Sequence, residues 1–172
     1  LGDLAARWQE DVIDLWPDVL SVFVGTNDAE RHLGRLLRAD DPKTVPDFDF
    51  ADWERTYRGL LDQARQANPA LKIVLCTPFA APCGKIVEGA LGEYYPLRQR
   101  ILAQCCVIVE RIAADYGATL VPFHRLIADL ETRLPNGDAT YWVWDGIHPT
   151  PAGQRLMADC WIGAAARNGV ME

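Results

Sequence analysis

Basic residues are outnumbered in this sequence, and no stretch of it concentrates them. There are 17 Lys and Arg against 24 Asp and Glu, which gives a formal net charge of -7 at pH 7. Proteins that bind nucleic acids usually carry a basic patch that neutralises phosphate groups. The charge balance therefore argues against nucleic acid as a partner.

Long hydrophobic runs are also missing. The apolar runs at residues 19–24 and 73–76 are far shorter than the roughly 20 residues that a membrane-spanning helix needs, so we expect no membrane span. The first residue is Leu1 and not Met, and no basic segment followed by an apolar one opens the chain. We therefore expect the natural start to precede residue 1, which leaves room for a secretory signal upstream.

Paired cysteines are absent as well. The 5 cysteines form an odd set without C-x-x-C spacing, and Cys105 and Cys106 are neighbours in a helical stretch. This usage suits free thiols and favours a reducing, cytoplasmic setting. With 172 residues, 49% of them hydrophobic, the chain can bury one core, and we expect a single domain over residues 1–172.

What the sequence does contain is an alternation of helical and strand patterns. Continuous apolar runs, typical of buried strands in a parallel sheet, occur at residues 19–25, 72–76 and 119–121. Amphipathic spacing predicts helices at residues 3–15, 52–67, 97–116, 123–134 and 151–166. Asn136 and Gly137 predict a turn. This order of elements predicts an α/β fold with a parallel sheet.

Polar residues follow the first predicted strand, in the order Gly25, Thr26, Asn27. In an open parallel sheet, ligands collect at the carboxyl ends of the strands. A glycine there permits a sharp turn, and the amide of Asn27 could donate a hydrogen bond to developing negative charge. Taken alone, the motif is better interpreted as a plain turn.

Asp145 and His148 lie three residues apart, with Gly146 between them, just before a predicted helix with Thr150 as N-cap and Pro151 as its first residue. A turn at Gly146 would fold the carboxylate onto the imidazole, which would fix the tautomer and favour the protonated ring. The dipole of the following helix disfavours a positive charge on His148, and a nearby carboxylate would offset this effect by stabilising the imidazolium. The pattern suits a general base, or else a helix-entry loop in which His148 acts only as a cap.

The two motifs together are more specific than either alone. The segments VLSVFVGTND and WDGIHPTPAGQRLMAD resemble the third and fifth conserved blocks of the SGNH (GDSL-type) hydrolases. DLAARWQEDVIDLWPD and KIVLCTPF resemble the intervening segments of their bacterial lysophospholipase-L1-like esterases. The resemblance covers essentially the whole chain. It implies a flavodoxin-like three-layer sandwich and a carboxylic-ester hydrolase that needs neither a metal nor an organic cofactor.

The resemblance also assigns roles to individual residues. In that family the asparagine of the third block donates to the oxyanion, which points to Asn27, and Gly25 matches the structural glycine of the same block. The aspartate and histidine of the fifth block complete a Ser-His-Asp triad, which points to Asp145 and His148.

The nucleophile of the family has no counterpart in this sequence. The Gly-Asp-Ser block and the oxyanion glycine of the second block both precede the point where the chain begins. We therefore expect an N-terminally truncated domain whose first strand or strands are missing. Their absence would leave the strand at residues 19–25 with an unpaired apolar edge, through which the chain could self-associate.

Residues inside the chain do not replace these blocks. Ser21 is the only serine and lies six residues before Asn27. At ~3.3 Å per residue it is on the order of 20 Å of chain from the catalytic end, so we expect a buried strand serine and not a nucleophile. Gly2 is too close to the following helix to stand in for the second-block glycine. Cys76 and Thr77 fall at the end of a strand, but a buried cysteine is usually only a small hydrophobic residue.

The remaining candidates have simpler interpretations. His32 and His124 have no recognisable ligand spacing, so we predict no metal site. Trp142 and Trp144 are expected to shape the loop by packing, or else to line an acyl or sugar pocket. The charged stretch at residues 31–41 is expected to form a mobile loop over the site.

Two functions therefore remain open. The first is a hydrolase that acts on a small-molecule ester, which could be a lipid, an acetylated sugar or a simple ester. The second is a non-catalytic domain of the same type that has lost its nucleophile and binds a ligand or partner. A nucleotide-binding domain is disfavoured because no Gly-rich phosphate loop follows a strand.

Overall fold

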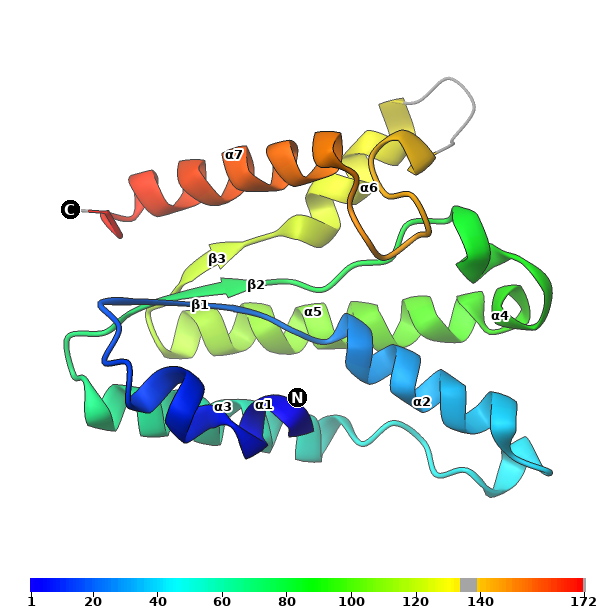
Figure 1. Cartoon of the computed structure of the whole chain (residues 1–172), viewed down its shortest axis with the longest axis horizontal. Coiled ribbons are helices and arrows are strands. Elements are labelled where there is room, and N and C mark those ends of the chain that lie inside the picture. Colours follow the sequence, from blue (N-terminus) through cyan, green and yellow to red (C-terminus); the bar gives the residue numbers. More distant parts are fainter. Residues whose placement is uncertain (134–138, 172) are drawn as a thin grey trace.

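The computed structural model describes residues 1–133 and 139–171 as a parallel sheet enclosed by helices (Figure 1). The strands are β1 (Val19–Phe23), β2 (Lys72–Cys76) and β3 (Thr119–Val121), in the spatial order β1-β2-β3. Both pairings are parallel. The predicted α/β fold and its three-layer arrangement are confirmed.

Helices cover both faces of the sheet. In Figure 1, α6 and α7 lie over one face, and α3 and α5 lie over the other. The α-helices are α1 (Gly2–Ala6), α2 (Thr26–Arg38), α3 (Phe50–Ala67), α4 (Gly89–Glu93), α5 (Tyr95–Asp115), α6 (Phe123–Arg133) and α7 (Pro151–Arg167). Shorter helical turns are η1 (Gln9–Ile13), η2 (Pro42–Thr44), η3 (Gly84–Val87) and η4 (Ala139–Tyr141).

The central strand β2 divides the core into two clusters. Ile73 and Leu75 pack into the cluster on the α3 and α5 side, whereas Val74 and Cys76 pack into the cluster beneath α6 and α7. All four side chains are buried. Successive residues of a strand point to opposite faces, so a strand covered on both faces is apolar throughout. This explains why the apolar run predicted the strand correctly.

Two predicted elements have a different form in the structure. The helix expected at residues 3–15 is divided into α1 and η1, which ends at Ile13, and the chain then turns at Trp16, which has a φ of 47°. The loop expected at residues 31–41 is wrong, because α2 continues to Arg38. Leu33 and Leu36 of α2 are buried with Ala29 at helical spacing. The exposed Arg31, Arg35 and Arg38 obscured this apolar stripe in the sequence.

Strand β1 forms one edge of the sheet and pairs only with β2 within the part of the chain that the structure describes. Phe23 is 44% exposed. The expectation that Ser21 is buried is wrong, because an edge strand leaves this side chain accessible. The hydroxyl oxygen of Ser21 accepts a hydrogen bond from Nε1 of Trp161 at 3.0 Å.

Other predictions concern membrane spans, thiols and a turn. Within residues 1–133 and 139–171, no helix has the length and apolar character needed to cross a bilayer. All five cysteines are free thiols. The turn predicted at Asn136 and Gly137 lies outside the described residues.

Candidate active site

Asp145 and His148 form a hydrogen-bonded pair in the loop before α7. Oδ2 of Asp145 lies 2.7 Å from Nδ1 of His148. Oδ1 accepts hydrogen bonds from the backbone N–H groups of Ile147, at 3.1 Å, and of His148, at 2.8 Å. The chain folds back here because Gly146 has a φ of 94°, which a side chain would disfavour. The turn predicted at Gly146 is therefore present.

The contacts of Asp145 fix its ionisation. Burial acts to raise the pKa of Asp145, but the hydrogen bonds from the ring and backbone of His148 and from the backbone of Ile147 outweigh it and hold the pKa below its usual value. A carboxylate with two accepting oxygens requires that Nδ1 of His148 be the donor. Nε2 is then free to accept a proton, which is the arrangement that a general base requires.

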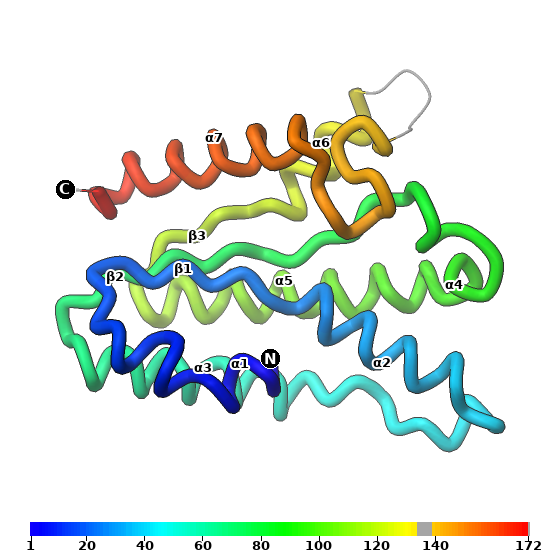
Figure 2. The backbone as a smooth tube through the Cα atoms, in the orientation of Figure 1, coloured from blue at the N-terminus to red at the C-terminus, as the bar shows by residue number. Residues whose placement is uncertain are grey.

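A neighbouring segment, residues 81–86, supports this loop. The backbone N–H of Ala81 donates to the carbonyl oxygen of Gly146 at 2.8 Å, and Sγ of Cys83 donates to the carbonyl oxygen of Val143 at 2.9 Å. A Cβ at Gly84 would lie 2.6 Å from Cα of Asp145, so only glycine fits. In Figure 2 the orange loop between α6 and α7 approaches the green segment that follows β2.

Two further contacts involve residues close to His148 in the chain. Thr150 caps α7, since its hydroxyl oxygen accepts a hydrogen bond from the backbone N–H of Gly153 at 3.2 Å, as predicted. The ring of Trp144 stacks on that of His148 with a centroid separation of 5.8 Å and an interplanar angle of 20°. Trp144 is 56% exposed, so it contacts His148 without being buried in the core.

The second arm of the site begins where β1 ends. Gly25 has a φ of 123°, and a Cβ at this position would lie 2.8 Å from Cγ of Pro78. The hydroxyl of Thr26 donates to the carbonyl oxygen of Phe79 at 3.1 Å. These contacts fix the first turn of α2 against the segment after β2. The side-chain amide of the exposed Asn27, in that turn, makes no hydrogen bond to any residue that the structure describes.

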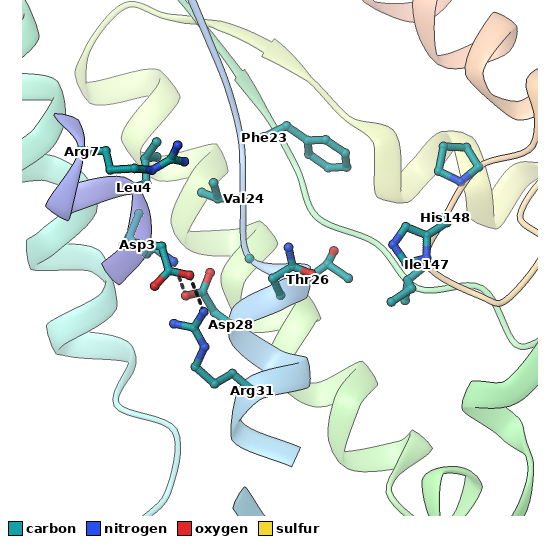
Figure 3. Close-up of a pocket in the computed structure, with 14 residues that line it drawn as sticks. Asp3, Leu4, Arg7, Phe23, Val24, Thr26, Asp28, Arg31, Ile147 and His148 are labelled. Carbon is teal, nitrogen blue, oxygen red and sulfur yellow. Dashed lines mark hydrogen bonds and ion pairs between the residues drawn. The ribbon is translucent and has the colours of Figure 1, made fainter. Parts of the chain in front are cut away.

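Both arms line one cavity of about 510 Å³. His148 contributes from the first arm, which is the loop before α7, and Gly25 and Asn27 contribute from the second. In Figure 3, Ile147 and His148 lie on the side of the cavity opposite to Leu4, with Thr26 between them. The structure therefore brings together an unpartnered amide and an imidazole with a carboxylate behind it. Their catalytic roles remain predictions.

The other sequence candidates lie elsewhere or are already bonded. Burial raises the pKa of the Cys76 thiol to about 11, which keeps it protonated at neutral pH. Thr77 is fully buried, and its hydroxyl contacts Nδ1 of His124 at 2.7 Å. His32 is buried beside the ring of Phe48. Among the described residues, no group of His, Cys, Asp and Glu side chains is arranged to hold a metal ion.

Sequence reasoning did not single out Gly84 or Arg98. Gly84 lies in a Pro-Cys-Gly segment that reads as an ordinary loop, and its contact with Asp145 depends on the fold. Arg98 is completely buried in α5. A signal for Arg98 existed, because it falls at helical spacing with the buried Ile101, Leu102 and Cys105.

Comparison with known proteins gives consistent results. The sequence model of the GDSL-like Lipase/Acylhydrolase family matches residues 1–156. An acetylxylan esterase of Geobacillus stearothermophilus is 32% identical over 163 residues, which are 93% of this chain and 64% of that protein. The chain thus spans less than two thirds of the length of this curated relative.

Solved structures of similar proteins share the fold. A candidate GDSL-like lipase from Parabacteroides merdae superimposes with a TM-score of 0.78 at 27% identity, over 98% of this chain and 68% of that one. The acetylxylan esterase Axe2 from Geobacillus stearothermophilus superimposes with a TM-score of 0.72 at 27% identity, over 95% of this chain and 66% of that one. Two further Axe2 structures are of catalytic mutants, in which alanine replaces a serine and an aspartate respectively.

Proposed function

The chain belongs to the GDSL-like lipase/acylhydrolase family, and on this premise we propose that it is the base-and-oxyanion part of a carboxylic-ester hydrolase. The observation that carries the proposal is the hydrogen bond of 2.7 Å between Asp145 and His148, in a loop that lines the same cavity as Asn27. A nucleophile that enters this cavity would meet a base and an amide donor together.

The proposed acylation step uses these three residues. Nε2 of His148 removes the proton from a serine hydroxyl, and the serine oxygen attacks the ester carbonyl carbon. Asp145 keeps Nδ1 protonated and stabilises the imidazolium that forms. The amide of Asn27 donates to the oxyanion of the tetrahedral intermediate. The intermediate collapses when His148 returns the proton to the leaving alcohol oxygen.

Deacylation repeats the same cycle with water. His148 removes a proton from a water molecule, and the resulting hydroxide attacks the acyl carbon. The second tetrahedral intermediate again places its negative oxygen against Asn27. The bond to the serine oxygen then breaks, the serine regains its proton from His148, and the carboxylic acid leaves. No step requires a metal ion or an organic cofactor.

We assign the nucleophile to a serine outside these 172 residues. Ser21 is the only serine of the sequence. It lies in the middle of β1, and its hydroxyl oxygen accepts a hydrogen bond from Trp161. The curated relative is longer than this chain, and replacement of a serine in Axe2 gives a catalytic mutant. A segment that adds a strand beside the open edge of β1 could bring a serine to the cavity.

The substrate class that we favour is an acetylated carbohydrate. The relative that matches 93% of the chain is an acetylxylan esterase. Trp144 and Tyr141, which are 56% and 66% exposed, belong to the same loop region as His148. Exposed aromatic rings next to a catalytic base suit the apolar faces of sugar rings, since both surfaces lose contact with water when they stack.

A serine-directed fluorophosphonate tests the proposal, with the full-length protein and its His148→Ala variant as the pair. We expect covalent labelling of one serine outside the 172 residues, and much slower labelling of the variant. Acetate release from acetylated xylo-oligosaccharides should follow the same pattern. Labelling of Ser21, or equal labelling of both proteins, would contradict the mechanism. Absence of any labelling or turnover would favour the alternative, a non-catalytic binding domain.

A further inference from the structure

Arg98 is a charged side chain with no exposed surface. Its exposed fraction is 0%, and it lies in the first turns of α5 on the face that packs into the core. A guanidinium group is always protonated in proteins, so its burial is costly unless several partners receive its hydrogen bonds. The partners of Arg98 therefore show what this charge organises.

Arg98 contacts two different parts of the chain. Nε and Nη2 donate to the two carboxylate oxygens of Glu30, at 2.5 and 3.1 Å. Nη1 donates to the backbone carbonyl oxygen of Ile86 at 3.2 Å. A bidentate pair fixes the direction of an arginine as well as its distance from the carboxylate. The third bond leaves the side chain little freedom to move.

Each of these partners lies next to one of the two segments that form the candidate site. Glu30 lies in α2, about one helical turn beyond Asn27, so its position sets that of the first turn of the helix. Ile86 packs directly on the turn at Gly146 in the loop of Asp145 and His148, since a Cβ at Gly146 would lie 2.4 Å from Cδ1 of Ile86. Arg98 is thus the buried link between the helix of Asn27 and the loop of His148.

We propose that Arg98 is a positioning residue that sets the separation between the amide of Asn27 and the imidazole of His148. It does not line the cavity and acts only through Glu30 and Ile86. The inference rests on the proposed function for its effect on catalysis. Its effect on the geometry of the two arms is independent of any activity.

The test needs a variant that removes the link without leaving a lone charge in the core. The double replacement Glu30→Leu with Arg98→Met does this, because exchange of a buried ion pair for apolar residues of similar volume often preserves stability. Arg98→Lys is the conservative variant, since it retains the charge but cannot make the bidentate contact. Arg111→Met is the matched control on the same helix, where the exposed Arg111 pairs with Glu54.

Two readouts are made on the full-length protein. The first is the NMR signal of the Asn27 side-chain amide and of the His148 ring nitrogens, which reports geometry without turnover. The second is the separate measurement of kcat and KM for 4-nitrophenyl acetate. Thermal unfolding of each variant shows whether it is folded.

We expect the double variant to unfold cooperatively, with both sets of NMR signals shifted and kcat lowered by about 10–100-fold, because displacement of catalytic groups by about 1 Å has effects of this size. KM should change less than kcat, Arg98→Lys should be intermediate, and Arg111→Met should match the wild type. Wild-type signals in the folded double variant, or in Arg98→Lys if the double variant does not fold, would overturn the inference. Shifted signals in a protein without His148-dependent turnover would sustain it and reject only the proposed function.

Discussion

Gly84 lies so close to Asp145 that a single methyl group at position 84 would stand 2.6 Å from Cα of Asp145. The backbone of the loop that holds Asp145 and His148 therefore packs against a position where only glycine fits. If the proposed function holds, we expect Gly84→Ala to displace Asp145 and His148 together and to lower kcat of the full-length protein by on the order of 100-fold. Steady-state kinetics with 4-nitrophenyl acetate measure this effect.

Gly89→Ala is the matched control for this prediction. Gly89 also has a positive φ, of 50°, but nothing lies within 4 Å of a Cβ built there. Both substitutions introduce backbone strain of roughly 1–2 kcal/mol, and only Gly84→Ala adds the steric contact. Equal losses of activity in the two variants would show that strain, and not contact with Asp145, is responsible.

The local parts of this structure were predictable from the sequence. The pairing of Asp145 with His148 involves residues three apart, and the turn between them requires only a glycine at position 146. The buried strand β2 was predicted because both of its faces are covered, which makes the whole segment apolar. Each of these features is encoded within a few neighbouring residues.

Contacts between distant segments were not predictable in the same way. Gly84 lies against Asp145 and Arg98 pairs with Glu30, both far away in the chain, and the sequence gives no direct sign of which segments will meet. Helix α2 was missed because the charges of Arg31 and Arg35 dominate the pattern, although Leu33 and Leu36 are buried. Ser21 was expected to be buried even though an unpaired edge was expected for its strand, and its exposure accompanies the position of β1 at the edge of the sheet.

His124 should make the stability of the protein depend on pH. Burial lowers the pKa of His124, an effect that Glu110 opposes and Arg125 reinforces. A folded-state pKa below the unfolded value of about 6.5 means that its contribution to stability is complete above pH 6.5 and is lost as the pH falls through the folded pKa. His124→Asn retains an acceptor for Thr77 but does not titrate. The Tm of the wild type should therefore fall more than that of the variant between pH 8 and pH 5, and parallel curves would refute this.

Cys76 should be an inert thiol. Its pKa of about 11 lies well above that of an ordinary cysteine, so the thiolate fraction at pH 8 is reduced by about 100-fold. Alkylation by iodoacetamide, followed by mass spectrometry of the peptides, should modify Cys76 in the folded protein far more slowly than after denaturation. The partly exposed Cys160 serves as the internal reference. Cys76→Ala should retain the full esterase activity of the full-length protein. An inactive but folded Cys76→Ala variant would restore the thiol as a candidate nucleophile.

The open edge of β1 should cause the isolated 172-residue chain to associate. Among the described residues β1 pairs only with β2, and Phe23 on this strand is 44% exposed. Unpaired N–H and C=O groups along an apolar edge strand favour pairing with a second chain, whereas a charged residue opposes it. Sedimentation velocity should show dimers or larger species for the isolated chain, and fewer of them for Phe23→Lys. A monomeric, cooperatively folding chain would mean that the edge is protected.

The central claim is that His148, oriented by Asp145, is the base of an ester hydrolase. The most direct measurement is kcat/KM of the full-length protein for 4-nitrophenyl acetate, compared with that of His148→Ala at matched thermal stability. We predict a loss of about 1,000-fold or more, as removal of one member of a catalytic triad produces in other hydrolases. An activity that remains within a factor of about three of the wild type would contradict the account, because the reaction would then proceed without His148 as its base.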